Sequence, residues 1–385
     1  MDIAFLQTDA FRNLANARLE FHPQLNLVVG DNGQGKTNLV EALALVTGRP
    51  SFRTLDLSEV RQHGAARTLL SARLRGDAVT LGVVLADGVR EHYVDGEKAT
   101  RLAVSRRAPV VFLTARDLTR LTGAPAERRR ALDRAALAAD ADHGRTLAAY
   151  EKARASKARL LALRHRFDAD ELAVYESTMA ETGGRVAAAR RRAAAALLPE
   201  IARQAARLRS KARDLALDLV SDLPAEGTPE SFAAALHDGM REKGAEERRA
   251  GRCLVGPHRE DAVLRADGVP VATRASSGEN RTFVLAWTLA ELSLVAAAAG
   301  TAPALAFDDF DSEWDPEVLA SFARALPEGG QVFLTSARPD AVRGLPLPAG
   351  VLFRMTAGRL SREGILGAGR GEGSGARRAV RVGER

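Results

Sequence analysis

The stretch of sequence that decides the fold is Asn26-Leu27-Val28-Val29-Gly30-Asp31-Asn32-Gly33-Gln34-Gly35-Lys36-Thr37-Asn38-Leu39. Residues 30–37 match the pattern GxxxxGK[ST], with an apolar strand before them and a helix after them. Glycines let successive backbone amides converge on phosphate oxygens, and the start of the helix adds partial positive charge. This predicts a nucleotide-binding loop in which Lys36, also an expected catalytic residue, reaches the β and γ phosphates and Thr37 binds Mg²⁺. The expected nucleotide ligands are Gly30, Asp31, Asn32, Gly33, Gln34, Gly35, Lys36 and Thr37.

The segments around this loop predict an α/β fold. Short apolar runs at residues 3–6, 17–21 and 25–29 are typical of strands, and a helix should run from Lys36 to the break at residues 48–50. Two-residue alternation over residues 68–94, with Asp-Gly turns, indicates a small antiparallel sheet, and residues 110–113 add another strand.

A second apolar strand ends in two carboxylates. Residues 305–307 are followed by Asp308 and Asp309. After a P-loop, this arrangement suits one oxygen ligand for Mg²⁺, assigned to Asp308, and one catalytic base for water, assigned to Asp309. The alternative is a strand-end turn, which aspartates also favour.

A third motif lies between the loop and the acidic strand. Ser276-Ser277-Gly278-Glu279 precedes an apolar helix and resembles the signature loop of ABC-type ATPases. Ser276 and Gly278 are therefore expected to bind the γ-phosphate of ATP held by a second subunit. The order of P-loop, helical insertion, signature loop, acidic strand and the turn at residues 312–315 is that of an ABC head.

The helical insertion is rich in arginine. Residues 127–215 predict three or four helices, with breaks at residues 183–184 and 199. Between residues 185 and 213 nine basic side chains face one acid, which favours a polyanion as partner. The alternative is that these arginines only solubilise Ala-rich helices. The candidate DNA contacts are Arg190, Arg191, Arg192, Arg207, Arg209 and Lys211.

Composition limits the compartment and the chemistry. The formal net charge is +7, and the single cysteine, Cys253, excludes an intramolecular disulfide or a multi-cysteine zinc site. The N-terminus does not resemble a signal peptide, and the charge-free run at residues 292–307 is too short to span a bilayer. We therefore expect a cytoplasmic protein without a membrane segment.

Several strings together resemble the RecF family. They are the P-loop segment at residues 26–39, Gly256-Pro257-His258-Arg259-Glu260-Asp261, the segment 123–133 with its three consecutive arginines, and the turn at residues 312–315. The resemblance extends to about residue 360. Departures are Ala115-Arg116 in place of Pro-Glu, Ser277 and Glu279 in place of glutamines, and a basic C-terminal tail.

The resemblance implies a function and further site residues. It implies a protein of DNA repair, replication and the SOS response that dimerises around ATP and Mg²⁺ and binds DNA at gaps or junctions. It further implies slow DNA-dependent ATP hydrolysis and action with RecO and RecR in loading recombinase. Arg12 is expected near the phosphates, and His258 and Arg259 are possible site residues; for the latter pair a capped turn with a buried salt bridge is the alternative.

The expected architecture is an ABC-ATPase-like head, with a mixed sheet around the P-loop plus antiparallel strands, and an inserted α-helical arm. The head should comprise residues 1–125 and 251–362, the arm residues 126–250, and a disordered tail residues 363–385. Alternative functions are an ATP-gated binding switch that does not cycle, an SMC-like tether, and another ABC-type ATPase such as a transporter subunit.

Overall fold

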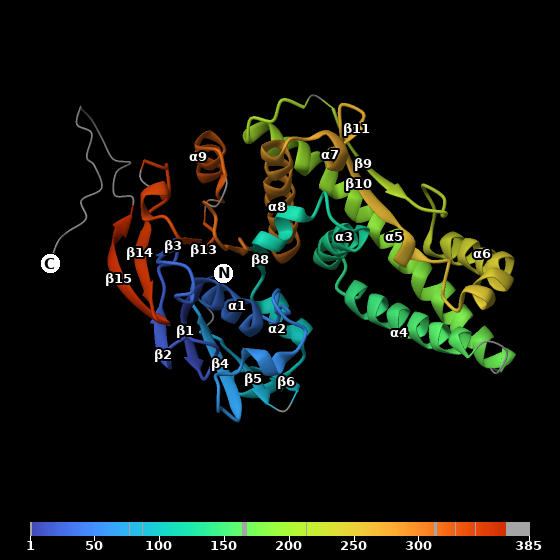
Figure 1. The fold of residues 1–385 in the computed structure, drawn as a ribbon, viewed down its shortest axis with the longest axis horizontal. Coiled ribbons are helices and arrows are strands. Elements are labelled where there is room, and N and C mark those ends of the chain that lie inside the picture. Colours follow the sequence, from blue (N-terminus) through green and yellow to red (C-terminus); the bar gives the residue numbers. More distant parts are fainter. Residues whose placement is uncertain are drawn as a thin grey trace. The chain divides into compact units, whose positions relative to one another are not determined.

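The computed structural model describes residues 2–76, 78–86, 88–163, 168–212, 214–311, 314–327, 329–342 and 344–366. Its contacts divide the chain into two compact units (Figure 1). The head unit comprises Met1–Leu118, Arg207–Arg209 and the chain from Val295 onward, and the arm unit comprises Thr119–Ala206 and Ser210–Leu294. The second boundary therefore differs from the expected one at residue 250, since residues 251–294 pack with the arm.

A mixed sheet of six strands forms the centre of the head unit, in the order β15-β14-β3-β13-β12-β8. β14, β3, β13, β12 and β8 are parallel to their neighbours, and β15 is antiparallel to β14. Because the strands are parallel, the carboxyl ends of β3, β12 and β13 meet at one edge. The strands are β3 (Leu25–Val29), β8 (Val110–Leu113), β12 (Ala304–Phe307), β13 (Val332–Ser336), β14 (Gly350–Thr356) and β15 (Arg359–Leu366).

An antiparallel sheet forms the second layer of the head unit, in the order β2-β1-β4-β5-β6-β7. Its strands alternate buried and half-exposed residues, as a sheet packed on one face should. They are β1 (Ile3–Asp9), β2 (Ala17–Glu20), β4 (Arg67–Leu74), β5 (Thr80–Ala86), β6 (Val89–Val94) and β7 (Glu97–Ala99). The expected strands around the P-loop and over residues 68–94 are confirmed.

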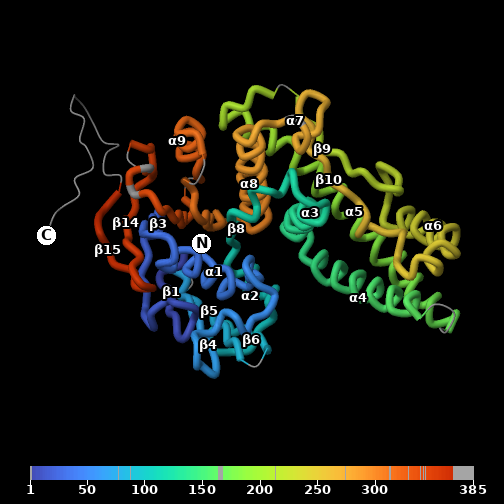
Figure 2. Tube along the Cα trace, in the orientation of Figure 1, coloured from blue at the N-terminus to red at the C-terminus, as the bar shows by residue number. Residues whose placement is uncertain are grey.

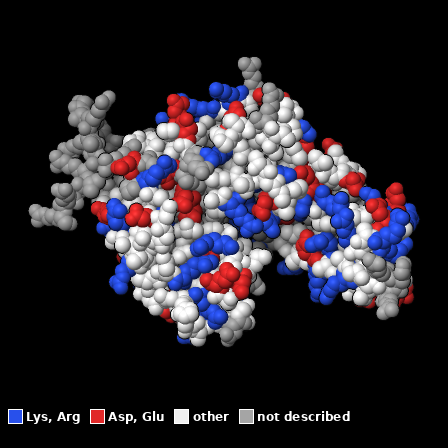
Figure 3. All heavy atoms as spheres, in the orientation of Figure 1, with Lys and Arg blue, Asp and Glu red and all other residues white. Residues whose placement is uncertain are grey.

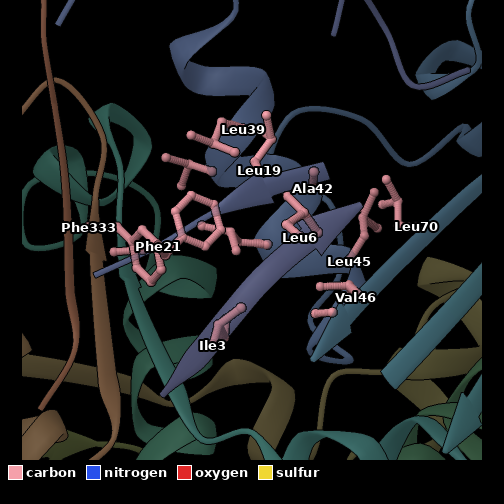
Figure 4. Close-up of a cluster of buried hydrophobic side chains, with 14 of the residues drawn as sticks. Ile3, Leu6, Leu19, Phe21, Leu39, Ala42, Leu45, Val46, Leu70 and Phe333 are labelled. Atoms are coloured by element: carbon pink, nitrogen blue, oxygen red, sulfur yellow. The ribbon is translucent and has the colours of Figure 1, made fainter. Parts of the chain in front are cut away.

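The helix after the P-loop, α1 (Lys36–Val46), is almost entirely buried and contacts β4 and β5 of one sheet and β13 of the other. Figure 4 shows Leu39, Ala42 and Leu45 of this helix in the common core. In the same core, the rings of Phe21 and Phe333 pack edge to face with centroids 5.0 Å apart. The P-loop is therefore anchored at both ends, by a fully buried strand and a largely buried helix.

Shorter helices complete the head unit: η1 (Leu57–Val60), α2 (Arg101–Arg107), α9 (Pro316–Ala325) and η4 (Pro339–Val342). η2 (Ala115–Thr119) leads out of the head unit after β8, and the chain returns through α8, as the trace in Figure 2 shows. The arm is thus inserted between two neighbouring strands of the mixed sheet, β8 and β12, which pair in parallel.

The arm unit consists of long helices and a three-stranded sheet in the order β11-β10-β9. Its helices are α3 (Pro125–Ala139), α4 (His143–Ala162), α5 (Ala169–Arg207), α6 (Pro229–Ala250), η3 (Pro257–Arg259), α7 (Val271–Arg274) and α8 (Ser277–Ala299). Its strands are β9 (Leu215–Val220), β10 (Asp261–Ala266) and β11 (Val269–Pro270). β10 contacts α3, which explains why residues beyond 250 belong to this unit.

The expected breaks at residues 183–184 and 199 are wrong, because α5 runs unbroken through both. A side-chain carbon added to Gly184 would lie 2.3 Å from the carbonyl oxygen of Pro229, so the glycine is needed for close approach to the start of α6. Pro199 and Ala195, whose carbonyl loses its helical hydrogen bond, are both exposed, so water can satisfy that carbonyl.

Two other expectations concern the C-terminal half. Residues 363–366 belong to β15, which corrects the start of the expected tail, and residues 367–385 lie outside the described residues. Among the described residues, α8 alone is long and apolar enough to cross a membrane, but 67% of its most apolar window is buried within the protein. This burial is typical of a core helix.

Candidate functional site

The P-loop is shaped by its glycines. Gly30 has φ 155°, and a side-chain carbon there would lie 2.4 Å from the carbonyl oxygen of Met355 in β14. Gly35, at the start of α1, has φ 117°, in the left-handed region that favours glycine. The loop backbone therefore packs tightly against the β14–β15 hairpin, and its amides precede a helix N-terminus, where anions bind.

Lys36 lies inside this loop and is only 4% exposed. Its ammonium donates to the carbonyl oxygens of Gly30, at 2.7 Å, and Asp31, at 3.0 Å. These contacts place a buried positive charge beneath the loop's backbone amides. From this position the ammonium of Lys36 can exchange its hydrogen bonds to the two carbonyl oxygens for bonds to phosphate oxygens when a nucleotide binds.

The acidic pair is at the carboxyl edge of the mixed sheet, directly after β12. Asp308 is 6% exposed and accepts a hydrogen bond from the hydroxyl of Thr335 at 2.7 Å. Burial raises the pKa of Asp308, while hydrogen bonds from Thr335 and Thr37 oppose that rise. The two residues expected to bind Mg²⁺, Thr37 and Asp308, therefore lie near each other.

Asp309 lies beside the same group of charges. Burial raises the pKa of Asp309 above its ordinary value, and the neighbouring carboxylate of Asp311 adds to the rise, whereas Lys36 opposes it. A raised pKa moves a carboxylate toward the range in which a general base works near neutral pH. The structure thus brings Lys36, Thr37, Asp308 and Asp309 together.

The oxygen donors of this site fit Mg²⁺. One hydroxyl and one carboxylate are hard ligands, and Mg²⁺ usually takes one or two carboxylates, several waters and the phosphates of a nucleotide. Within the described residues no cluster of three or more His, Cys, Asp or Glu side chains forms an all-protein cage. The residues that would hold the ion are therefore Thr37 and Asp308, with a nucleotide supplying further oxygens.

Arg12 forms hydrogen bonds with residues outside the phosphate-binding loop. Its guanidinium forms a two-pronged ion pair with Glu41 of α1 and donates to the carbonyl oxygen of Glu59 at 3.1 Å. The neighbouring Asn13 contacts the loop instead, by donating to the carbonyl oxygen of Gly33 at 3.0 Å. In this structure Arg12 therefore supports α1, and Asn13 is the residue of this segment that contacts the P-loop.

Thr335 was missed by the sequence analysis, although it touches both acidic residues. It is a polar residue near the end of the apolar strand β13, and it follows Leu334, which pairs with Phe307 of β12. The polar residue is visible in the sequence. The pairing of β12 with β13 is not, because the strands of one sheet can be ordered in many ways.

The predicted signature loop lies in the arm unit, whereas the P-loop lies in the head unit. Ser276 accepts a hydrogen bond from the amide of Glu279 at 3.2 Å, and the Glu279 carboxylate accepts one from the amide of Ser276 at 3.0 Å. This reciprocal pair is a capping box that fixes the start of α8. Gly278 lies in the first turn with no atom within 4 Å of its Cβ position.

The turn expected after the acidic strand is described only in part: Ser312 and Glu313 lie outside the described residues, and Asp315 caps α9 by accepting from the amide of Glu317 at 2.8 Å.

Arg190 is corrected from a DNA contact to a structural residue. It is 3% exposed, and its guanidinium bonds to both oxygens of Asp133 at 2.9 Å. It also donates to Glu260 at 3.1 Å and to the carbonyl oxygen of Pro257 at 2.6 Å. Four of the five N–H donors of this buried guanidinium are used inside the arm unit, so the side chain is not available to a polyanion.

Arg191 is also engaged within the arm unit. It bonds to Glu260 at 2.9 Å and to the carbonyl oxygen of Pro224 at 2.8 Å, and its guanidinium lies 4.4 Å from the ring centre of Phe232. On the face in Figure 3 basic and acidic side chains are interleaved, so no single-sign stripe covers that view. The exposed candidates that remain are Arg192, Arg207, Arg209 and Lys211, while Arg213 lies outside the described residues.

The motif at residues 256–261 joins the three-arginine segment of α3. Asp261 forms a two-pronged ion pair with Arg128, at 2.6 and 2.8 Å, and the carbonyl oxygen of Glu260 accepts from Arg129 at 2.6 Å. His258 shares a 2.5 Å hydrogen bond with the hydroxyl of Tyr150. The structure therefore favours the capped turn with buried salt bridges; only Arg259 of this motif's charged residues is exposed.

His258 predicts an acid-sensitive arm unit. Burial lowers the pKa of His258 to about 4, so the folded state resists protonation while the unfolded chain takes up a proton near pH 6.5. The free energy of unfolding therefore does not depend on the protonation of His258 above pH 6.5. It decreases as the pH falls toward 4, by up to about 3 kcal/mol, because the unfolded chain is protonated first. Urea unfolding followed by the fluorescence of Trp287, in a Trp314→Phe background, measures it because Trp287 is the arm unit's tryptophan.

The control for this prediction is His258→Gln, which keeps a polar group beside Tyr150 but does not titrate. Its arm stability should change less between pH 7 and pH 4.5 than that of the parent protein. Equal pH dependence in the two proteins would show that His258 is not the sensitive group. Burial also lowers the pKa of His92 to about 4. His92 lies in the head unit, so it does not belong to the unit whose unfolding Trp287 reports.

The mixed sheet, the P-loop and the acidic pair beside it define an ABC-ATPase-like head. The profile of the family described as RecF/RecN/SMC N terminal domain matches residues 3–357. The chain is 34% identical over 356 residues to the DNA replication and repair protein RecF of Myxococcus xanthus, covering 89% of this chain and 93% of the relative. It is 34% identical over 373 residues to that of Symbiobacterium thermophilum, covering 93% and 97%. The chain belongs to the RecF family.

Solved structures agree on the fold. The recombination mediator protein RecF with ATPrS in the RecFOR pathway superposes with a TM-score of 0.84 at 23% identity, covering 94% of this chain and 97% of that one. An Smc head domain with an extended coiled coil, derived from Pyrococcus furiosus and bound to the C-terminal domain of ScpA, gives 0.53 at 17% identity, covering 95% and 96%. These likenesses confirm the α/β fold of an ABC-type head with a helical arm.

Proposed function

We propose that this chain is an ATP-dependent DNA-binding protein of recombinational DNA repair and replication, in which ATP closes two heads into a clamp on DNA. The observation that carries the proposal is the single group formed by Lys36, Thr37, Asp308 and Asp309 at one edge of the mixed sheet. The close relatives act in DNA replication and repair by name, and the solved relatives were described with ATP or ATPrS. ATP and Mg²⁺ are the proposed ligands.

Each residue has a role in this proposal. Lys36 leaves the carbonyl oxygens of Gly30 and Asp31 and binds the β and γ phosphates, and the P-loop amides hold the remaining phosphate oxygens. Thr37 and Asp308 hold Mg²⁺, which would neutralise charge that develops on the phosphates. Asp309 accepts the proton of the attacking water. Aspartate is shorter than the glutamate of most ABC motors, so we expect slow ATP hydrolysis. We also propose that this hydrolysis is regulatory and that DNA stimulates it.

The clamp requires two chains. Ser276, at the N-terminus of α8, would bind the γ-phosphate held by Lys36 of a second copy, because a capped helix N-terminus favours anions. Arginine and lysine contacts to phosphates, from Arg192, Arg207, Arg209 and Lys211, would then bind single-stranded, gapped or branched DNA with little sequence preference. RecO and RecR are proposed as partners in loading recombinase and in supporting the SOS response. The proposed compartment is the cytoplasm.

An ATP-dependent dimer is the first test. Sedimentation with ATP and Mg²⁺, with and without gapped DNA, should show a dimer for the wild type and a monomer for Ser276→Arg. Ser177→Arg is the matched control, because it places the same side chain on an exposed position of α5. We expect Ser177→Arg to dimerise and to retain DNA like the wild type. A constant oligomer that ignores ATP would rule out the clamp.

Asp309→Asn in the same experiment separates the clamp from a binding switch that does not cycle. A variant that still dimerises and binds DNA but no longer hydrolyses ATP, and that still supports repair in cells, would favour the switch. The SMC-like tether is disfavoured by the arm itself, since residues 119–206 and 210–294 form a compact unit with its own buried core. A transporter subunit would require a membrane partner, which a pull-down would show.

A further inference from the structure

The hydroxyl of Thr335 links the two acidic residues. It donates to Oδ1 of Asp308 at 2.7 Å and accepts from the backbone amide of Asp309 at 2.8 Å. The side chain is 1% exposed, so water does not compete for these bonds. A hydroxyl has one proton, and that proton is committed to Asp308. Both bonds therefore hold the threonine and the acidic pair in one arrangement.

The backbone of Thr335 adds a third link. Its carbonyl oxygen accepts from the amide of Phe310 at 3.0 Å, immediately after the acidic pair. Asp309 has φ 50°, in the left-handed region that a non-glycine residue adopts at a cost. The turn after β12 is thus held in an uncommon conformation by the end of β13, and Thr335 makes three of the bonds that hold it.

The other strand beside β12, β8, offers no side-chain link to the acidic pair, although the carbonyl oxygen of its last residue, Leu113, accepts from the backbone amide of Asp308 at 2.9 Å. Thr114, at the end of β8, is also buried, but its hydroxyl donates to Asp117 at 2.9 Å. Ser336, next to Thr335, donates to the carbonyl oxygen of Arg338 at 3.0 Å. Among these hydroxyls at the ends of the neighbouring strands, the one bonded to the acidic pair is that of Thr335.

We propose that Thr335 is a positioning residue, which fixes the Asp308 carboxylate for Mg²⁺ and the backbone of Asp309 for its role as base. With Oδ1 held by Thr335, the carboxylate cannot rotate freely, so its other oxygen keeps one direction for a metal ion. Outer hydrogen bonds of this kind orient metal ligands, and their loss typically costs about 10–100-fold in metal affinity or activity. The inference rests on the proposed ATPase function.

Thr335→Val is the main test, because valine keeps the shape and removes the hydroxyl. Binding of a fluorescent ATP analogue, titrated with Mg²⁺, should require about 10–100-fold more Mg²⁺ for half-maximal effect, and ATP turnover should fall by a similar factor. Binding of the analogue in EDTA should stay unchanged, since Lys36 and the P-loop are intact. Thr335→Ser, which keeps the hydroxyl, should remain within about threefold of the wild type.

Thr114→Val is the matched control, since it removes a buried hydroxyl beside β12 that does not touch the acidic pair. Equal Mg²⁺ requirements in Thr335→Val and Thr114→Val would overturn the positioning role. If Thr335→Val does not fold, Thr335→Cys gives the same test, because a thiol is a weaker hydrogen-bond donor than a hydroxyl. A wild-type Mg²⁺ requirement in Thr335→Cys would equally overturn the positioning role. A wild-type protein that binds no ATP would remove the proposed function itself, and the inference with it.

Discussion

Replacing Lys36 with methionine is expected to weaken ATP binding by about 100-fold or more. Hydrogen bonds to charged groups contribute about 1.5–3 kcal/mol each, and the ammonium would make such bonds to two phosphates. Methionine is unbranched, is one heavy atom shorter than lysine and nearly preserves the buried volume, so the loss reports mainly the charge. Lys36 is 4% exposed and already lies inside the loop, so it binds phosphate by exchanging its bonds to the carbonyl oxygens of Gly30 and Asp31.

The measurement is the shift in thermal unfolding on adding ATP and Mg²⁺. Nucleotide at 100 times its dissociation constant should stabilise the wild type by about 2.7 kcal/mol, and Lys36→Met should show almost none of this. Lys152→Met is the control, because Lys152 is an exposed lysine of α4 in the arm unit. Equal ATP stabilisation in Lys36→Met and Lys152→Met would mean that the P-loop does not bind the nucleotide.

The sequence predicted the P-loop half of the site because its signals are local. Residues 30–37 combine glycine spacing, a preceding apolar strand and a following helix, and each of these features is set by neighbours in the chain. The same holds for the Asp-Gly turns of the antiparallel sheet. The acidic pair was assigned from the apolar strand before it and from its place in the chain after the P-loop. Its proximity to Thr37 follows from the parallel sheet that joins β3, β13 and β12.

Features that depend on distant residues were not predictable in this way. Thr335 is bonded to the acidic pair only because β13 lies beside β12. Gly183 and Gly184 look like a helix break, but they permit α5 to approach α6, which starts 45 residues after Gly184 in the numbering. Arg190 to Arg192 are identical in type, and about 100° of helix rotation per residue places them on different faces. Burial then assigns Arg190 to the interior and Arg192 to solvent.

Replacing Arg190 with methionine is expected to destabilise the arm unit by about 3–5 kcal/mol, because it leaves buried carboxylates without their main partner. Asp133 would keep His143 at 3.0 Å, and Glu260 would keep Arg191 at 2.9 Å. His143 balances Asp133 only when protonated, so its hydrogen bond replaces the charge of Arg190 incompletely. The change should appear in urea unfolding followed by Trp287 in the Trp314→Phe background.

Arg185→Met is the control for this substitution, since Arg185 lies on the same helix, is exposed, and in the described part of the chain forms an ion pair with Glu181 one turn away. Exposed pairs of this kind contribute about 0.3–0.5 kcal/mol, so the control should be close to the parent protein. The comparison also separates stability from DNA binding. A DNA contact at Arg190 would predict loss of affinity with an unchanged unfolding midpoint, whereas the buried network predicts a large shift of the midpoint. An unshifted midpoint together with weakened DNA binding would show that Arg190 contacts DNA. The ion pairs of Arg190 with Asp133 and Glu260 would then not be what stabilises the packing of α3, α5 and β10.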